Sequence, residues 1–197
     1  MTVPAAFIGE MAELGLSIES PWDLVNTKRS YRAAIPVLIG WLERADDDVP
    51  AHERSRFREA LVRSLAVKQA RGVAAPALLR EFRRSDASSD YRWAVGNTLE
   101  VVADDTVFDE VADLARDRGY GRDRQMVVLA LARMTNPGAV DVLSEVLDDE
   151  TVAGHAVMAL GRLKASRARS VIEGCLDHPQ PWVRKEAKKA LAKIADN

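Results

Sequence analysis

The sequence predicts an all-α fold, an α-α superhelix in the form of a right-handed solenoid of about five helix pairs with an N-terminal helical cap. Residues 139–163 and 168–194 carry the same apolar pattern, in which Val142 aligns with Val171 and Leu160 with Leu191. Self-similarity at a period of about 30 residues is typical of stacked helical repeats. No stretch alternates apolar and polar residues convincingly at a period of two, so we expect no sheet.

The same pattern continues towards the N-terminus. The Ala-Leu pair of the second helix recurs as Ala130-Leu131, Thr98-Leu99 and Ala60-Leu61, and the residues seven before each leucine are Arg54, Arg92, Arg124, Ala153 and Arg184. We therefore expect residues 33–197 to form one structural domain of five repeats, at approximately 33–67, 73–103, 107–135, 138–164 and 167–195.

Each predicted helix has an apolar stripe and a turn signal beside it. In the second helix of one repeat, Val95, Leu99 and Val102 recur at three- and four-residue intervals, which gives a stripe that only a neighbouring helix can bury. Turns are marked by 46–50, 85–89, 136–138 and 177–179. The helices are expected near 33–44, 52–67, 73–84, 90–103, 107–117, 122–135, 138–148, 151–164, 167–177 and 181–195.

Residues 1–32 lie outside the five repeats. Phe7, Met11 and Leu14 would share one face of a short helix over 4–14, and a second short helix is expected to begin at Trp22, after Ser20-Pro21. We interpret this segment as a cap over the apolar face of the first repeat. A ligand-binding role for Trp22 is the alternative.

The block from Trp182 to Leu191 resembles the second helix of HEAT repeats, and specifically the short bacterial HEAT-like kind. The resemblance extends over roughly residues 33–195 and implies a helical solenoid. It also implies that the repeat arginine pairs with a turn aspartate six residues earlier. Asp48 and Asp86 have this spacing from Arg54 and Arg92, whereas the later repeats depart from it.

Composition fits a soluble helical protein, because the 197 residues are 47% hydrophobic and 29% charged. Since no targeting segment is recognised at its start, we expect a cytoplasmic bacterial protein. The start of the chain has neither a basic n-region nor a long apolar run, so we expect no signal peptide and no membrane association. Cys175, the one cysteine, falls on a core position and is expected to be a small buried apolar residue.

Charge is unevenly distributed along the chain. Residues 162–193 contain nine basic and three acidic residues, which gives about +6, so the remainder of a chain of net charge −2 carries about −8. Such a distribution would let a partner dock in one orientation. A solvated terminal cap is an equally good interpretation.

Catalytic constellations are absent from the sequence. His52, His155 and His178 lie in different repeats without a second ligand at metal-binding spacing, so we expect no metal and no other cofactor. Deoxyhypusine hydroxylase, an iron enzyme of HEAT repeats, uses repeated His-Glu pairs, and only His52-Glu53 matches that pattern. We therefore expect a protein that is not an enzyme.

The expected function is that of a protein–protein interaction scaffold or adaptor, which binds a protein or peptide on the concave surface of the solenoid. Helical spacing predicts that this surface contains Trp93, Asn97, Gln125, Leu129, Arg133, Met158, Arg162, Lys185 and Lys189. A rotation of the helices that buries the apolar members between repeats is the competing interpretation.

The alternative function is a DNA-binding enzyme of the alkylpurine DNA glycosylase type, another group with HEAT-like repeats. Trp93, Asn97, Arg124 and Trp182 would then line a groove. However, the position one turn after Trp93 is an asparagine where an acid would be needed. With a net charge of −2 we also do not expect binding to nucleic acid.

Overall fold

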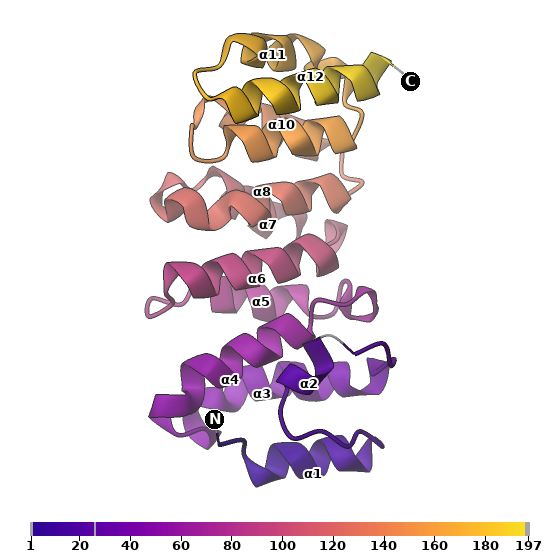
Figure 1. Cartoon of the computed structure of the whole chain (residues 1–197), viewed down its shortest axis with the longest axis vertical. Coiled ribbons are helices and arrows are strands. Elements are labelled where there is room, and N and C mark those ends of the chain that lie inside the picture. Colours follow the sequence, from indigo (N-terminus) through magenta and orange to yellow (C-terminus); the bar gives the residue numbers. More distant parts are fainter. Residues whose placement is uncertain (1, 26, 196–197) are drawn as a thin grey trace. The chain divides into compact units, whose positions relative to one another are not determined.

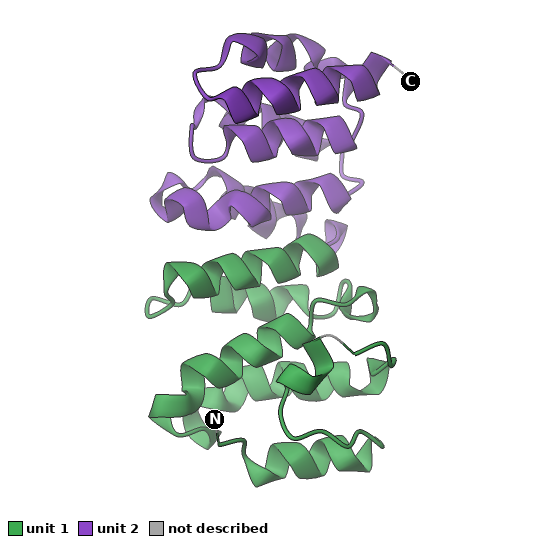
Figure 2. Cartoon of the chain, viewed as in Figure 1, with its two compact units in different colours: residues 1–102 green, residues 103–197 purple. Residues whose placement is uncertain are grey.

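The computed structural model describes residues 2–25 and 27–195, and it contains only helices within these ranges. The all-α prediction is therefore confirmed (Figure 1). The chain divides into two compact units, residues 1–102 (unit 1) and 103–197 (unit 2) (Figure 2). The division into a cap over 1–32 and one domain over 33–197 stays a prediction.

Unit 1 consists of two helix pairs preceded by two short helices. Its helices are α1 (Ala5–Glu13), α2 (Trp22–Val25), α3 (Ile35–Asp48), α4 (Ala51–Ser64), α5 (Ala75–Phe82) and α6 (Ser89–Val102), with 3-10 turns η1 (Arg32–Ala34) and η2 (Lys68–Ala70). The pairs are α3 with α4 and α5 with α6, and they stack through contacts of α4 with α6 and of α3 with α5. This is the arrangement that the apolar stripes require.

The short helix α1 covers the first pair of unit 1. Phe7 is fully buried and meets Trp41 and Phe57 edge to face, with ring centroids 5.6 and 5.4 Å away. Met11 is buried on the same side of α1. Edge-to-face packing of this kind adds about 1 kcal/mol per pair to the free energy of burial. The N-terminal helix is thus held by aromatic packing.

Unit 2 contains three helix pairs, each closed by short 3-10 turns. Its elements are η3 (Asp105–Val107), α7 (Phe108–Arg116), η4 (Arg118–Arg124), α8 (Gln125–Ala130), η5 (Leu131–Arg133), α9 (Gly138–Glu145), η6 (Val146–Asp148), α10 (Ala153–Arg162), η7 (Ser166–Ala168), α11 (Arg169–Gly174), η8 (Cys175–Asp177) and α12 (Pro181–Ala195). The second helices form a layer in which α10 contacts α8 and α12, while α7 contacts α9 behind them (Figure 1).

Small residues set the distance between α10 and α12. An ideal Cβ built on Gly161 would lie 2.9 Å from the Cα of Ala190, which is closer than two carbon atoms can approach. Gly154 lies two turns earlier on the same face of α10, and a Cβ at this position would overlap the ring of Trp182. The two glycines therefore allow α10 and α12 to pack backbone against backbone.

The repeat arginines bind main-chain carbonyls at the end of the first helix of their own repeat. Arg54 donates to the carbonyl of Val49 at 2.7 Å, and Arg184 to that of His178 at 2.7 Å. Arg92 donates to Phe82 and Arg84 in the same way. Because the last carbonyls of a helix have no partner within it, a guanidinium satisfies them well.

The partner expected for Arg54 was wrong. Asp48 pairs with Arg44 on its own helix at 3.3 Å, while Arg54 turns to the carbonyl of Val49. Arg124, another repeat arginine, does bind an aspartate: it is buried and pairs with Asp149 in the turn before α10. That turn belongs to the repeat in which Ala153 replaces the arginine, so the arginine of the preceding repeat satisfies its carboxylate.

Cys175 is buried, as expected, and burial raises the pKa of its thiol. In the portion of the chain that the structure describes, no helix has the length and apolar character needed to span a membrane.

Candidate functional site

Two of the predicted binding residues lie on α6 in unit 1. The side chain of Trp93 is 46% exposed, which is unusual because tryptophan side chains are mostly buried in folded proteins. Asn97 is half-buried one turn later, and its amide donates to the carbonyl of Trp93 at 2.9 Å. Trp93 is therefore presented to solvent on the regular part of a helix.

Two predicted residues on α8 serve the packing of unit 2. Leu129 is 4% exposed and belongs to the core. The amide of Gln125 donates to the carbonyl of Thr151 at 2.7 Å and so joins α8 to the turn that precedes α10. These two positions therefore serve the contact of α8 with the neighbouring repeat, where α8 packs against α10.

The other predicted residues of unit 2 face solvent at least in part. Met158 is half-buried on α10, and a guanidinium nitrogen of the exposed Arg162 lies 3.8 Å from its sulfur. Arg133 is exposed at the end of η5. On α12, Lys185 and Lys189 are exposed, and the ammonium of Lys189 pairs with Glu186 at 2.7 Å.

Trp182 belongs to the same surface, although the spacing rule that selected the other residues left it out. It lies in the first turn of α12, is 40% exposed, and rests on Gly154 of α10. Its ring lies 5.0 Å from that of His155, and burial lowers the pKa of this histidine. The sequence did contain a signal for this exposed tryptophan. It stands two positions before the repeat arginine, and the previous repeat has a glycine, Gly154, at the position that faces it.

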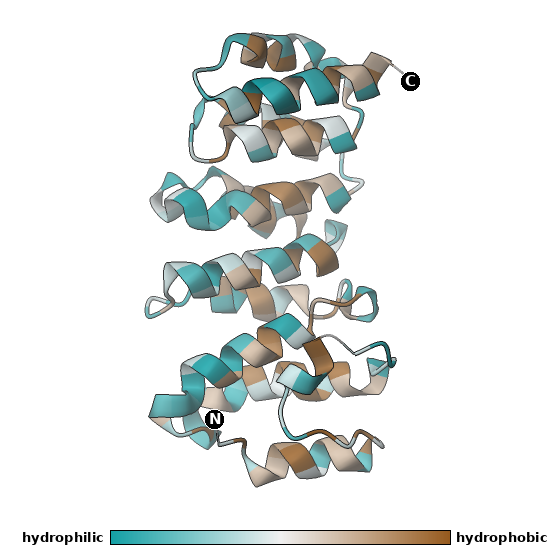
Figure 3. Cartoon of the chain, in the orientation of Figure 1, coloured by the Kyte–Doolittle hydropathy of each residue, from teal (hydrophilic) through white to brown (hydrophobic). Residues whose placement is uncertain are grey.

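Basic residues dominate the second helices of unit 2. We define the second-helix layer of unit 2 as α8, η5, α10 and α12. It contains seven basic residues and one acidic residue, and the acidic one, Glu186, is buried. The basic residues are Arg133, Arg162, Arg184, Lys185, Lys188, Lys189 and Lys193. The hydrophilic character of α12 is visible in Figure 3.

The first helices of unit 2 have the opposite charge. We define the first-helix layer of unit 2 as η3, α7, α9, η6, η7, α11 and η8, and it contains nine acidic and three basic residues. All three basic residues are engaged there: Arg116 with Glu145 at 2.7 Å, Arg167 with Asp141 at 3.1 Å, and Arg169 with Glu173 at 3.0 Å. Unit 2 thus separates positive and negative charge between its two layers.

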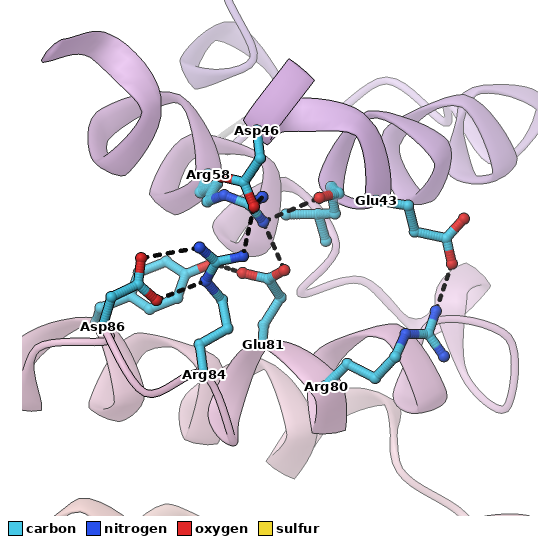
Figure 4. A network of polar contacts seen from close by, with 9 residues as sticks. Glu43, Asp46, Arg58, Arg80, Glu81, Arg84 and Asp86 are labelled. Carbon is cyan, nitrogen blue, oxygen red and sulfur yellow. Dashed lines mark hydrogen bonds and ion pairs between the residues drawn. The ribbon is translucent and has the colours of Figure 1, made fainter. Parts of the chain in front are cut away.

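Unit 1 holds a polar network instead. Arg58, 4% exposed on α4, binds Glu81 of α5 at 2.6 Å, Asp46 at 2.9 Å and the carbonyl of Leu42 (Figure 4). The hydroxyl of Tyr91 donates to Glu81 at 2.5 Å, and burial followed by the charge of Glu81 raises the pKa of Tyr91.

Arg84 extends this network to the surface, where it binds both Asp46 and Asp86 at 2.9 Å. The hydrogen bond from Arg84 lowers the pKa of Asp46. A cleft of about 260 Å³ lies beside the network. Two of the arginines that line it, Arg58 and Arg84, are matched by these carboxylates, and the ion pairs hold α3, α4 and α5 together.

No cluster of three or more histidine, cysteine, aspartate or glutamate side chains is placed to hold a metal ion among the residues described. The one His-Glu pair of the sequence, His52 and Glu53, brings an imidazole nitrogen and a carboxylate oxygen to 4.0 Å at the start of α4.

Comparisons with known proteins bear on the repeats. A family model for HEAT repeats matches residues 148–197. The structure is similar to a designed armadillo repeat protein at 15% identity and a TM-score of 0.47, over 88% of this chain and 98% of that one. None of the curated proteins compared with the chain matches it significantly. The HEAT-type resemblance is confirmed, most directly for the part of the chain that contains α10, α11 and α12.

Proposed function

We propose that the protein is a non-catalytic scaffold that binds a protein or peptide through the second-helix layer of unit 2. Helical repeats of this kind commonly bind proteins on their extended surfaces, and the match to HEAT repeats supports such a role. The proposal places the protein in the bacterial cytoplasm, in agreement with its composition.

The observation that carries the proposal is the exposure of Trp182 beside Met158 on a helical surface. Trp182 is only partly covered although it sits on a glycine that allows close contact from below. Aromatic residues with exposed rings and well-packed bases are frequent anchors of protein interfaces. The adjacent Arg162, Lys185 and Lys189 form a polar rim of the kind that surrounds such anchors.

Trp93 and Asn97 form a second exposed patch, in unit 1. We include them in the proposal as a separate contact, because a half-exposed tryptophan on α6 has the same anchor character. Gln125 and Leu129 pack beneath this surface, so they would contribute little direct contact with a partner.

The DNA glycosylase alternative is not carried further. Arg124, one of the four groove residues it requires, is fully buried and holds Asp149 and a carbonyl of α7. Asn97, at the position of the needed acid, is bonded to its own helix. No observation in the described residues favours this second function.

The test begins with a pull-down from the native host and identification of the bound proteins by mass spectrometry. The affinity of the purified partner is then measured by calorimetry for the wild type, Trp182→Ala and Val171→Ala. Val171 is a matched control, because it is an exposed apolar residue of α11 in the first-helix layer, 42% exposed.

We expect Trp182→Ala to weaken binding by about 2 kcal/mol, as for a central anchor, and Val171→Ala to leave it unchanged. Met158→Ala should have a smaller effect of the same direction. If Val171→Ala weakens the complex while Trp182→Ala does not, the partner binds elsewhere and the proposal is wrong.

A further inference from the structure

We propose that the second-helix layer of unit 2 binds an acidic segment of its partner, one that carries at least one apolar side chain among its carboxylates. This inference rests on the proposed function and specifies the chemistry of the partner. Two observations support it: the separation of charge between the layers of unit 2, and the partly exposed ring of Trp182 in the first turn of α12.

The first step concerns the lysines of α12. Lys185 and Lys188 are exposed, and within the described part of the chain neither forms an ion pair. The one carboxylate of the layer, Glu186, is buried and is already bound to Lys189. A carboxylate brought by a partner would therefore find ammonium groups that no acidic residue of the layer neutralises.

The basic residues of α10 and α12 lie on the same surface as the ring of Trp182. Trp182, Lys185 and Lys189 are spaced so that they share one face of α12, and Met158 and Arg162 share one face of α10. Because Gly154 and Gly161 draw these two helices together, the basic groups and the Trp182 ring belong to one continuous surface. A segment crossing both helices would meet positive charge with an aromatic ring at the helix start.

The third step distinguishes a protein segment from a nucleic acid. The acidic first-helix layer is about one helix diameter behind the basic layer, roughly 10 Å, and this is close to the Debye length at physiological salt. At longer range the net charge of −2 governs, and it repels a polyanionic duplex. A short acidic peptide contacts the basic layer alone and is less affected.

The fourth step concerns a second copy of the chain, whose acidic first-helix layer is the other negative surface at hand. Glu145, Asp141 and Glu173 of that layer are already bound to arginines of the same chain. Asp148 is likewise bound to Arg118, so four of the nine carboxylates of that layer are already neutralised within their own chain. A partner with unpaired carboxylates is the better complement.

The experiment uses the full chain and a fluorescein-labelled peptide of about 12 residues, long enough when extended to cross three neighbouring helices. The peptide consists of glutamates with two leucines. Its controls are the same peptide with glutamine in place of glutamate and a single-stranded oligonucleotide of equal charge. Binding is measured by fluorescence anisotropy at low and physiological salt.

The variant K185E/K188E reverses two exposed charges of α12, and K28E/R29E reverses two exposed charges in unit 1 as a control of equal net charge. We expect the acidic peptide to bind the wild type and K28E/R29E alike, and K185E/K188E at least about tenfold more weakly. Circular dichroism of each variant checks that its helices remain, and the pair Lys185→Gln and Lys188→Gln provides a milder second variant with a smaller loss.

Five outcomes overturn the inference. Equal binding of the glutamine peptide shows that charge is not read, and tighter binding of the oligonucleotide shows a nucleic-acid surface. Equal losses in K185E/K188E and K28E/R29E show only a general charge effect. Self-association in sedimentation velocity that K185E/K188E abolishes assigns the surface to a second copy. If the captured partner depends on Trp182 but not on Lys185 and Lys188, the proposed function stands and the acidic segment does not.

Discussion

The two units of this chain use charged residues in opposite ways. Unit 1 draws Arg58 and Glu81 into its interior, where they connect α4 to α5. Unit 2 gathers basic residues on its second helices and acidic residues on its first helices, and its helices α10 and α12 pack closely where Gly161 meets Ala190. The same repeat pattern therefore supports both a polar and an apolar way of joining neighbouring repeats.

The difference teaches where a surface is available for binding. A charge that is paired inside the fold is occupied, and its removal affects stability before it affects any partner. A charge placed on an exposed layer without a carboxylate of its own contributes little to stability and remains accessible. This reasoning supports our proposal that the main binding surface is the second-helix layer of unit 2.

The largest expected effect is in unit 1. Arg58→Met leaves the carboxylate of Glu81 buried without its main partner, so the free energy of unfolding should fall by about 3 kcal/mol or more. Lys188→Met, on the exposed layer of unit 2, should change it by less than about 0.5 kcal/mol. Urea unfolding followed by circular dichroism measures both. Similar values for the two variants would remove the contrast between the units.

A second effect tests the apolar contact of unit 2. Gly161→Val places a branched side chain against the backbone of Ala190, and we expect a loss of about 2–3 kcal/mol in the free energy of unfolding. Gly174→Ala in α11 is the control, since no atom lies within 4 Å of its added Cβ. If Gly161→Val leaves the free energy of unfolding in urea unchanged, α10 and α12 are not in close contact.

Replacing either of the exposed tryptophans Trp182 and Trp93 by alanine should lower the free energy of unfolding by a smaller amount, and the two amounts should differ. Trp182→Ala uncovers Gly154 and His155 and should destabilise unit 2 by about 1–2 kcal/mol, because the lower side of the ring is packed. Trp93→Ala should cost about 0.5 kcal/mol or less. Thermal unfolding of the two variants gives the comparison. A large loss for Trp93→Ala would show that α6 buries this residue between repeats.

The smallest effect is a pH dependence in unit 2. Burial lowers the pKa of His155 in the folded state, so the unfolded chain takes up its proton first as the pH falls below about 6.5. Stability is therefore full above that value and decreases towards the folded pKa. Thermal melts at pH 7.5 and 5.5 should differ more for the wild type than for His155→Phe. His52→Phe, at an exposed position, should behave as the wild type.

Much of the fold could be predicted from the sequence, because local periodicity determines where helices form. The expected helices over 90–103 and 181–195 correspond to α6 at Ser89–Val102 and α12 at Pro181–Ala195. The 3-10 turns that end α8 and α9 were merged into longer helices, since the apolar spacing continues through them.

The site was less predictable, because it depends on how far each helix is rotated about its axis. Spacing alone placed Leu129 on the surface, although contacts of α8 with neighbouring helices bury it. It also left out Trp182, whose exposure depends on Gly154 in another repeat. The buried pair of Arg58 and Glu81 had no local signal, because its members are 23 residues apart.

The most direct test of the binding surface is hydrogen exchange, read by mass spectrometry, on the chain alone and in complex with its captured partner. The account predicts slower exchange in the complex over residues 153–162 and 181–195, which form α10 and α12, with little change over 138–145 and 169–174. Protection confined to α9 and α11 in the first-helix layer would contradict it.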